Sequence, residues 1–251
     1  MISTNLHANG VYELVVDCPP VNAFGIPLLD SLATRLKEVL ECSQARAVLL
    51  RAAGRGFSAG GDVKEVERLE GFQGILGQAK GALTATLAIL ECPLPVICAV
   101  HNYCIGVGVL IAASADILVA AEGTKFVLAE VESGATTGAV YALRLMSEKR
   151  ARAAMMTAEP VYAEELLAYG SVLKIVPPVN LEDAAMTVAA SVASKPPQAM
   201  KRLKESFNNT AGASEVRTLY RAELSYTYEL NIIGEASQGR KAFIEKVRGG
   251  Y

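Results

Sequence analysis

Two glycine-bearing turns carry the chemistry that this sequence most clearly suggests. The first, at 54–66 (GRGFSAGGDVKEV), follows a predicted strand at 46–52, and the second, at 100–110 (VHNYCIGVGVL), follows a predicted strand at 95–101. Each turn leads into a predicted helix, so backbone N–H groups from both turns can meet at one point, with a helix N-terminus behind the second. Such a pair of donors suits the stabilisation of an oxyanion on a carbonyl or thioester.

The first turn also matches two other motifs. Residues 56–60 (GFSAG) fit the nucleophile elbow of serine hydrolases, but the only histidine after Ser58 is His101, whereas that triad places its histidine much closer to the C-terminus. Residues 54–59 fit the dinucleotide-binding fingerprint, but 76–78 offer no acidic side chain for a ribose. Glycine turns after strands are also simple connections, and the residues alone leave that alternative open.

The elements around these turns predict an α/β fold. Residues 26–40 have apolar side chains at helical spacing, and strands are predicted at 11–17, 46–52, 95–101, 116–121 and 125–130. The alternation of strand and helix indicates an α/β core. Beyond residue 138 one strand is predicted, at 172–176, and helices are predicted at 181–194, 198–208, 215–232 and 235–247. The sequence Lys195-Pro196-Pro197 predicts the junction between a core domain, 1–194, and a C-terminal helical region, 195–251.

Composition excludes several classes of protein. Of the 251 residues, 51% are hydrophobic and 20% are charged, which is typical of a folded globular chain and not of a disordered one. The 24 basic and 26 acidic residues give no basic excess, so we expect no nucleic-acid partner. Residues 92–115 lack charged side chains but contain two prolines and a histidine, which favour a buried strand and helix over a membrane span.

The cysteines and the N-terminus indicate the compartment. The five cysteines are odd in number and include no C-x-x-C pair, so we expect reduced, mostly buried thiols. The first residues combine neither a basic stretch nor an apolar one, so no signal peptide is expected. These features predict a cytoplasmic protein with no membrane partner.

The two turns belong to a larger set of signatures. Residues 56–66 resemble the first signature of the crotonase (enoyl-CoA hydratase/isomerase) superfamily, and three more segments resemble the later ones: 95–100 with 106–108 and 115–117, 126–134, and 240–246. The matches follow the family's order through nearly the whole chain. The resemblance implies a crotonase-type core of repeated ββα units and a C-terminal helical trimerisation region. It also implies a homotrimer or a hexamer built as a dimer of trimers, and an acyl-CoA thioester substrate, with coenzyme A as part of that substrate and no prosthetic group or metal.

The resemblance also assigns roles to single residues. The backbone N–H groups of Gly61 and Val107 are expected to form the oxyanion hole, although Val107 stands where glycine is usual and crowds the pocket. A larger set is expected to contact coenzyme A: Ala59, Asp62 and Val63 along the adenine and pantetheine path, Lys64 near the phosphates, and Phe243 and Lys246 from a neighbouring subunit. Without the resemblance, the last two would be assigned to an ordinary amphipathic helix.

The departures from the family pattern concern the carboxylates. A typical hydratase of the family holds one water between two glutamates; the first corresponds here to Leu110, which cannot carry a proton, and the second to Glu130. Apolar surroundings would raise the pKa of Glu130 and let it act as acid or base. Glu132 would point to the same side if the strand continued, and is otherwise a solvated loop residue. Asp62 is the third carboxylate that we consider for activating water.

Family members with one carboxylate isomerise double bonds, and others hydrolyse C–C bonds in cyclic β-keto acyl-CoA thioesters. Residues 19–23, 46–51, 130–135 and 228–231 are similar to a branch that opens the last rings in bacterial steroid breakdown and that also lacks the first glutamate. We therefore expect ring opening of a cyclic β-keto acyl-CoA in steroid or alicyclic catabolism. The alternatives are enoyl-CoA hydration or Δ3,Δ2-isomerisation by Glu130, and a non-catalytic acyl-CoA-binding or RNA-binding protein.

Overall fold

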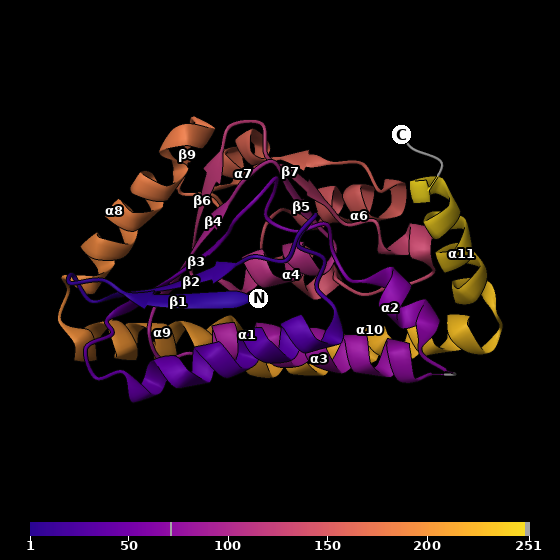
Figure 1. Ribbon diagram of the computed structural model, residues 1–251, viewed down its shortest axis with the longest axis horizontal. Helices are drawn as coiled ribbons and strands as arrows, with labels where there is room; N and C mark the ends of the chain where they lie inside the picture. Colours follow the sequence, from indigo (N-terminus) through magenta and orange to yellow (C-terminus); the bar gives the residue numbers. More distant parts are fainter. Residues whose placement is uncertain (71, 249–251) are drawn as a thin grey trace.

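Two β-sheets form the centre of the molecule. The computed structural model describes residues 1–70 and 72–248, without the side chains of residues 211 and 246–248, and Figure 1 shows its layers. The larger sheet has the strand order β1 (Ile2–Leu6), β2 (Val11–Val16), β3 (Ala47–Ala52), β4 (Val96–Val100), β6 (Ile117–Ala121) and β9 (Lys174–Val176). Only the β1–β2 pair in it is antiparallel. A smaller sheet contains β5 (Tyr103–Ile105), β7 (Lys125–Val127) and β8 (Val161–Tyr162).

Helices cover both faces of the larger sheet, as expected for a mostly parallel sheet whose strands are buried on both sides. The helices are α1 (Ile26–Glu38), α2 (Val63–Arg68), α3 (Gln73–Leu90), α4 (Val107–Ser114), α5 (Ala139–Ala142), α6 (Glu148–Thr157), α7 (Ala163–Tyr169), α8 (Leu181–Ala193), α9 (Pro197–Ala211), α10 (Ala213–Ile232) and α11 (Glu235–Arg248). Three short 3-10 turns accompany them: η1 (Val39–Glu41), η2 (Glu130–Ser133) and η3 (Pro178–Asn180).

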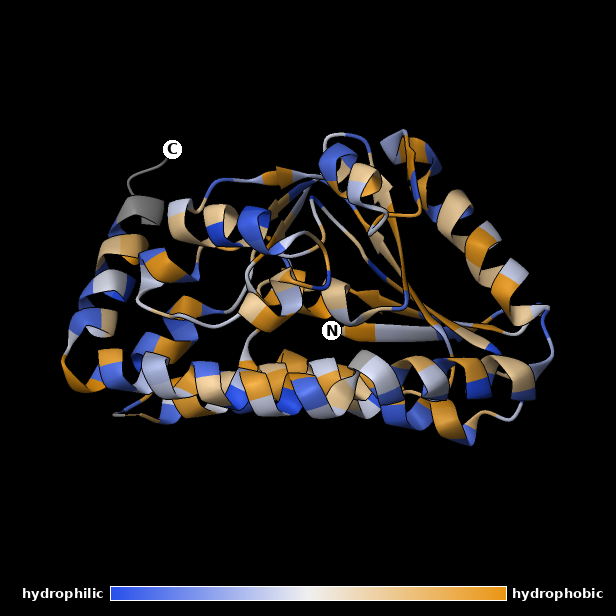
Figure 2. Ribbon diagram, turned by 180° about the vertical axis from the view of Figure 1, so that it is seen from behind, coloured by the Kyte–Doolittle hydropathy of each residue, from blue (hydrophilic) through white to orange (hydrophobic). Residues whose placement is uncertain are grey.

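The side chains of the strands alternate between two hydrophobic cores. In β3, Val48 and Leu50 point into the larger core with α1, α3, α4 and α10, whereas Ala47 and Leu49 point toward α8. Figure 2 shows this pattern as mainly hydrophobic strands between helices that carry both hydrophobic and hydrophilic residues. The alternation fixes the strand register, and therefore fixes where the loop after each strand begins.

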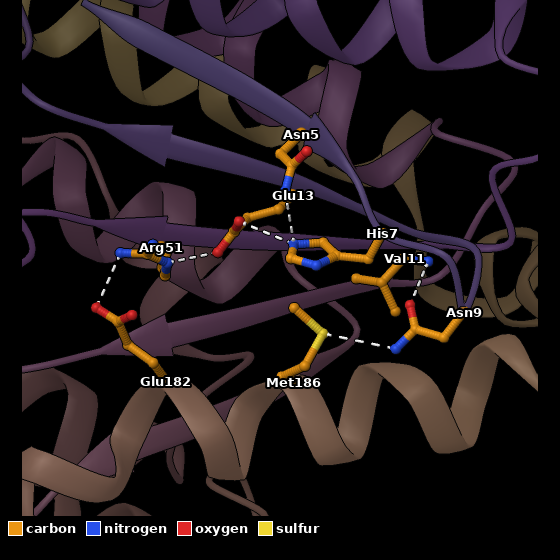
Figure 3. Close-up of polar contacts among 8 residues, drawn as sticks. All are labelled: Asn5, His7, Asn9, Val11, Glu13, Arg51, Glu182 and Met186. Carbon is orange, nitrogen blue, oxygen red and sulfur yellow. Dashed lines mark hydrogen bonds and ion pairs between the residues drawn. The ribbon is translucent and has the colours of Figure 1, made fainter.

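A polar network ties β2 and β3 to α8 (Figure 3). The Glu13 carboxylate accepts a hydrogen bond from Nε of Arg51 at 2.6 Å and contacts Nε2 of His7 at 3.0 Å, and Nη1 of Arg51 reaches Glu182 of α8 at 3.0 Å. Partial burial alone would raise the pKa of Glu13, but Arg51 and His7 outweigh it and hold that pKa below its usual value. The partners of Glu13 therefore give this strand carboxylate a structural role.

A second polar contact fastens α9 to the core. The Lys204 side chain is only 5% exposed, and its Nζ donates to the Asp116 carboxylate at 2.7 Å. It also donates at 3.1 Å to the backbone carbonyls of Ile89 and Leu94. Asp116 in turn accepts from the N–H of Val96 at 2.7 Å, so one ammonium joins α9 to the end of α3 and to the start of β4.

The observed elements confirm the predicted α/β class. Each strand predicted in the larger sheet is present, while β1, β5 and β8 were not predicted because they are short or lie at edges. The predicted strand at 125–130 ends at Val127, where the chain turns into η2. The predicted junction at 195–197 does separate α8 from α9, but the division into 1–194 and 195–251 stays a prediction. Residues 92–115 form β4, β5 and α4, and no helix in the described ranges is long and apolar enough to cross a membrane.

Replacing Lys204 with Met keeps the length of the side chain but leaves the Asp116 carboxylate and two carbonyls without their donor. We expect the free energy of unfolding, measured by urea denaturation, to fall by about 2–4 kcal/mol. Lys201→Met, at an exposed position of the same helix, is the matched control and should change it by less than about 0.5 kcal/mol. Equal effects of the two substitutions would contradict the anchoring role of Lys204.

Candidate active site

A pocket opens where both glycine turns, η2 and the C-terminal helices come together. It encloses about 1000 Å³ of space, part of it open to solvent, and α3, α10 and α11 supply most of the rest of its wall. The lining is mainly apolar, with a few polar side chains among which are Gln78, Glu130, Thr137, Tyr220 and Arg240. Such a lining, apolar with few polar groups, is typical of a site for a small molecule.

The two turns touch at glycines. A Cβ at Gly60 would lie 3.2 Å from the carbonyl oxygen of Ile105, and a Cβ at Gly106 would lie 3.7 Å from Cα of Gly60. Both residues also have positive φ angles, 97° and 52°, which side chains other than that of glycine rarely allow. The close approach of the two backbones is therefore built on glycine at both positions.

This contact presents two backbone N–H groups to the pocket. The N–H of Phe24 donates to the carbonyl of Gly60 at 2.7 Å and the N–H of Asp62 donates to Phe24 at 3.2 Å, so the N–H of Gly61 between them faces the other way. Val107 is the first residue of α4 and has no acceptor within the helix. Neither the Gly61 nor the Val107 N–H donates to an acceptor in the described part of the chain, and both residues line the pocket.

Glu130 lies beside these donors, at the start of η2. Its Oε1 is 3.1 Å from the position that a Cβ on Gly106 would occupy, and its Oε2 is buried without a hydrogen-bond partner. Burial raises the pKa of Glu130 to about 7, opposed by a hydrogen bond from its own backbone and reinforced by the nearby Glu223. A carboxyl group with this pKa can accept or donate a proton at neutral pH.

The last helix is packed directly onto η2. A Cβ at Gly134, where the chain leaves η2 with φ 71°, would overlap Cα of Ala236 in α11. A Cβ at Gly239 of α11 would lie 3.0 Å from the backbone nitrogen of Gly134. Figure 1 shows α11 folded back beside α2 at the same end of the molecule. Glycine at both contact points thus allows α11 to cover the segment that carries Glu130.

This packing corrects one expectation about coenzyme A. Phe243 was expected to reach the site from a neighbouring subunit, but it lines the pocket of its own chain, because α11 turns back after Gly234 and lies against η2 and α2. Arg240, one turn earlier, also lines the pocket, and its guanidinium contacts Glu67 of α2 at 3.1 Å and Asn231 at 3.0 Å. The side chain of Lys246 lies outside the described residues.

Glu132 does not share a side with Glu130, and the alternative, a solvated loop residue, is the one that the structure confirms. The strand stops at Val127 and η2 follows, so alternate residues no longer share a side, and Glu132 is exposed outside the pocket. The carboxylate of Asp62 caps α2 by accepting the N–H of Glu65 at 3.0 Å. The geometry therefore gives Asp62 a role in holding a helix and leaves Glu130 as the carboxylate that lines the pocket.

The remaining predicted contacts lie along or near the first turn. Ala59 and Val63 line the pocket, and Lys64 is exposed on the first turn of α2. Leu110 is buried in α4, and a Cβ at Gly138 would lie 3.5 Å from it and 3.3 Å from Leu128, so it belongs to an apolar core. The place of a second carboxylate is thus filled by packing.

The serine-hydrolase alternative does not fit the observed contacts. Ser58 is fully buried, and its Oγ donates to the carbonyl of Asn22 at 2.8 Å and accepts the N–H of Gly60 at 3.1 Å. His101 contacts the carbonyl of Gly54 at 3.0 Å. Both hydrogen-bonding functions of the serine are thus used to shape the turn, so Ser58 is a scaffold residue.

Sequence reasoning missed several pocket residues. Gln78 of α3 donates from Nε2 to the carbonyl of Phe24 at 2.9 Å, and its Oε1 is buried without a partner. Tyr220 of α10 is buried in the wall, where desolvation raises the pKa of its hydroxyl. One feature of the sequence could have identified Gln78 as a candidate: it is a polar residue in a helix whose neighbouring positions are mostly apolar.

Comparison with known proteins gives consistent matches over nearly the whole chain. A family model described as enoyl-CoA hydratase/isomerase matches residues 7–251. The (7aS)-7a-methyl-1,5-dioxo-2,3,5,6,7,7a-hexahydro-1H-indene-carboxyl-CoA hydrolase of Mycobacterium tuberculosis is 38% identical over 94% of this chain and 96% of its own length. The protein of the same name from Rhodococcus jostii is 34% identical over 97% of this chain and 94% of its own length.

A solved structure gives the same picture for the fold. The crystal structure of an enoyl-CoA hydratase/isomerase from Pseudoalteromonas atlantica matches with a TM-score of 0.84 at 26% identity. The match covers 98% of this chain and 97% of that chain, so it includes the C-terminal helices as well as the sheets.

The raised pKa of Glu130 predicts a pH-dependent cost in stability. Between pH 4.5 and 7 the folded chain binds a proton at this site that the unfolded chain loses, so the wild type loses stability as the pH rises through this interval. Glu130→Gln removes the titrating group. We expect the free energy of unfolding of this variant, relative to that of the wild type, to increase by about 1–3 kcal/mol from pH 4.5 to 8. Thermal unfolding of both proteins at each pH measures this difference. Glu132→Gln is the matched control; the same trend in both variants, or in neither, would contradict the assignment.

Proposed function

Because this chain belongs to the enoyl-CoA hydratase/isomerase family, we propose that it hydrolyses a carbon–carbon bond in a cyclic β-keto acyl-CoA thioester and so opens the ring. The observation that carries this proposal is the pairing of one buried carboxylate, Glu130, with two unpaired backbone N–H groups, those of Gly61 and Val107. Leu110 removes the second carboxylate. A site of this kind can stabilise an enolate and move one proton.

The proposed substrate class follows from the pocket and from the relatives. The two relatives described above are named as hydrolases of an indene-carboxyl-CoA that carries two ring ketones. The apolar wall of the pocket here, with Ile75, Ala79 and Leu224, is suited to a fused carbocyclic acyl group. We assign the reaction to the breakdown of steroid-derived or alicyclic acids.

In the proposed mechanism the thioester oxygen accepts hydrogen bonds from the N–H groups of Gly61 and Val107. Glu130 takes a proton from water, and the resulting hydroxide attacks the ring ketone. The bond between this carbonyl carbon and the carbon conjugated with the thioester then breaks, and its electron pair forms the enolate that the two N–H groups stabilise. Glu130 returns its proton to carbon. One water is consumed, a new carboxylic acid forms, and the thioester stays intact.

The coenzyme A moiety is proposed to leave the pocket past Ala59 and Val63, with Phe243 of the same chain against it. Lys64 is proposed to lie near the phosphates, because it is exposed on the helix that follows the first turn. Lys246 is still proposed to contact coenzyme A. Coenzyme A enters as part of the substrate, and the mechanism requires no prosthetic group.

The alternative is isomerisation or hydration of a linear enoyl-CoA with Glu130 as the single proton carrier. Its supporting observation is the pKa of Glu130 near 7, since one group that both accepts and donates a proton is enough to move a double bond. The site fits hydration less well than isomerisation, because Leu110 stands where a second carboxylate would hold the water.

We also propose a homotrimer, or a hexamer made of two trimers, located in the cytoplasm. Leu203 and Phe207 of α9 and Leu219 of α10 are 50%, 67% and 43% exposed, and such apolar clusters commonly mark subunit contacts. The five cysteines are free thiols, which suits a reducing compartment. Light scattering of the purified protein should give three or six times the 26.5 kDa of one chain, and a monomer at micromolar concentration would contradict this assembly.

Ring opening and thioester hydrolysis differ in whether free coenzyme A appears. With a bicyclic keto acyl-CoA as substrate, we expect a new acyl-CoA carboxylic acid by mass spectrometry and no free thiol with a thiol reagent. Glu130→Gln should lower kcat by at least about 10²-fold, while Glu132→Gln should leave it within about threefold.

Crotonyl-CoA and a 3-enoyl-CoA test the alternative. We expect no loss of the conjugated absorbance of crotonyl-CoA and no shift of the double bond in the 3-enoyl-CoA. If either linear substrate reacts rapidly while the bicyclic keto acyl-CoA does not react, the protein is an isomerase or a hydratase and the ring-opening proposal is wrong. Release of free coenzyme A from the bicyclic substrate would instead identify a thioesterase.

A further inference from the structure

Two unpaired acceptor atoms lie in the wall of the same pocket. Among the described residues, three buried side-chain atoms lack a hydrogen-bond partner: Oε1 of Gln78, Oε2 of Glu130 and the hydroxyl of Tyr103. The first two residues line the pocket. Leaving a buried acceptor unpaired is costly, so two such atoms in one pocket indicate that a ligand with donor groups occupies it.

The orientation of the Gln78 side chain is fixed. Its Nε2 donates to the carbonyl of Phe24 at 2.9 Å, and only the nitrogen end of the amide can donate, so Oε1 is the end left for a ligand. Phe24 is also the residue whose backbone pairs with Gly60 and Asp62. The contact that orients Gln78 is therefore part of the same backbone arrangement that orients Gly61.

Each of the two acceptor residues adjoins one of the glycine turns. A Cβ at Gly61 would lie 2.7 Å from Nε2 of Gln78 and 3.7 Å from the Val107 side chain. A Cβ at Gly106 would lie 3.1 Å from Oε1 of Glu130. Gln78 thus adjoins the first turn and Glu130 the second, and both line the pocket that the N–H groups of Gly61 and Val107 face.

The chemistry of these atoms identifies what they bind. Thioester and ketone oxygens only accept hydrogen bonds, so they are matched by the N–H groups and not by Gln78 or Glu130. Water carries two O–H donors. We propose that the nucleophilic water donates one hydrogen bond to Oε1 of Gln78 and the other to Oε2 of Glu130, which makes Gln78 a water-positioning residue. This inference rests on the proposed ring-opening reaction.

The two acceptors then have different tasks. The proton directed at Glu130 moves to the carboxylate as the water oxygen bonds to the ring carbonyl carbon. The proton directed at Gln78 stays on oxygen, because a neutral amide does not take a proton at neutral pH, and it becomes the O–H of the new carboxylic acid. Gln78 therefore fixes the direction of the oxygen lone pair and does not change the proton count of the reaction.

The test separates the water-dependent step from the step that needs no water. Gln78→Leu removes the acceptor at similar volume, and Gln78→Met is a second apolar variant. Gln73→Leu, an exposed position of the same helix, is the matched control. Two rates are measured for each: ring hydrolysis, and the exchange in D2O of the carbon-bound proton that Glu130 delivers to the product. Exchange uses Glu130 and the two N–H groups but no nucleophilic water.

We expect Gln78→Leu to lower kcat for hydrolysis by about 10²-fold, as for a misplaced nucleophile, with KM and the exchange rate within about threefold of wild type. A parallel fall of hydrolysis and exchange would mean that Gln78 only supports the fold of the turn. A rise in KM at constant kcat would mean that Oε1 binds the pantetheine amide instead, and unchanged rates would mean that it has no role; each of these outcomes overturns the proposal. A wild type that exchanges or isomerises but never hydrolyses would contradict the proposed function itself.

Discussion

The close contact between two backbone turns is the constraint on which the site depends. Gly60 and Gly106 meet where β3 and β4 deliver their following loops to one edge of the sheet, and a Cβ at either position would lie only 3.1–3.2 Å from a neighbouring oxygen atom. Both also have positive φ angles. The contact leaves the N–H groups of Gly61 and Val107 facing the same pocket, so the fold of two loops defines the place where negative charge can develop.

The C-terminal helices complete the environment of that place. α11 packs against η2 through Gly134, Gly239 and Ala236, and α10 contributes Tyr220 and Leu224 to the wall. Burial of Glu130 raises its pKa to about 7, in the range where proton transfer works at neutral pH. The same burial costs folding free energy above that pKa, which is a common consequence of building a proton carrier into an apolar site.

The sequence could predict those features that depend on local pattern. Apolar strands, glycine turns and helix periodicity located the sheet and both turns, whereas Glu130 was identified through the resemblance to the crotonase family. The sequence could not predict where β7 ends, because no residue type marks the change from strand to 3-10 turn between Val127 and Glu130. The two alternatives for Glu132 therefore stayed open until the structure was known. Nor could the sequence show that Phe243 lines the pocket of its own chain, which depends on the packing of α11 against η2. Gln78 was missed because its importance lies in the atom that has no partner.

The most direct measurement of the central claim is the fate of oxygen when a bicyclic keto acyl-CoA reacts in ¹⁸O-labelled water. Attack on the ring ketone predicts one ¹⁸O atom in the new carboxylate of an acyl-CoA product that still carries its coenzyme A. Label in a free acid together with released coenzyme A would place the attack at the thioester instead. No incorporation during turnover would contradict hydrolysis and would leave Glu130 as the proton carrier of an isomerase.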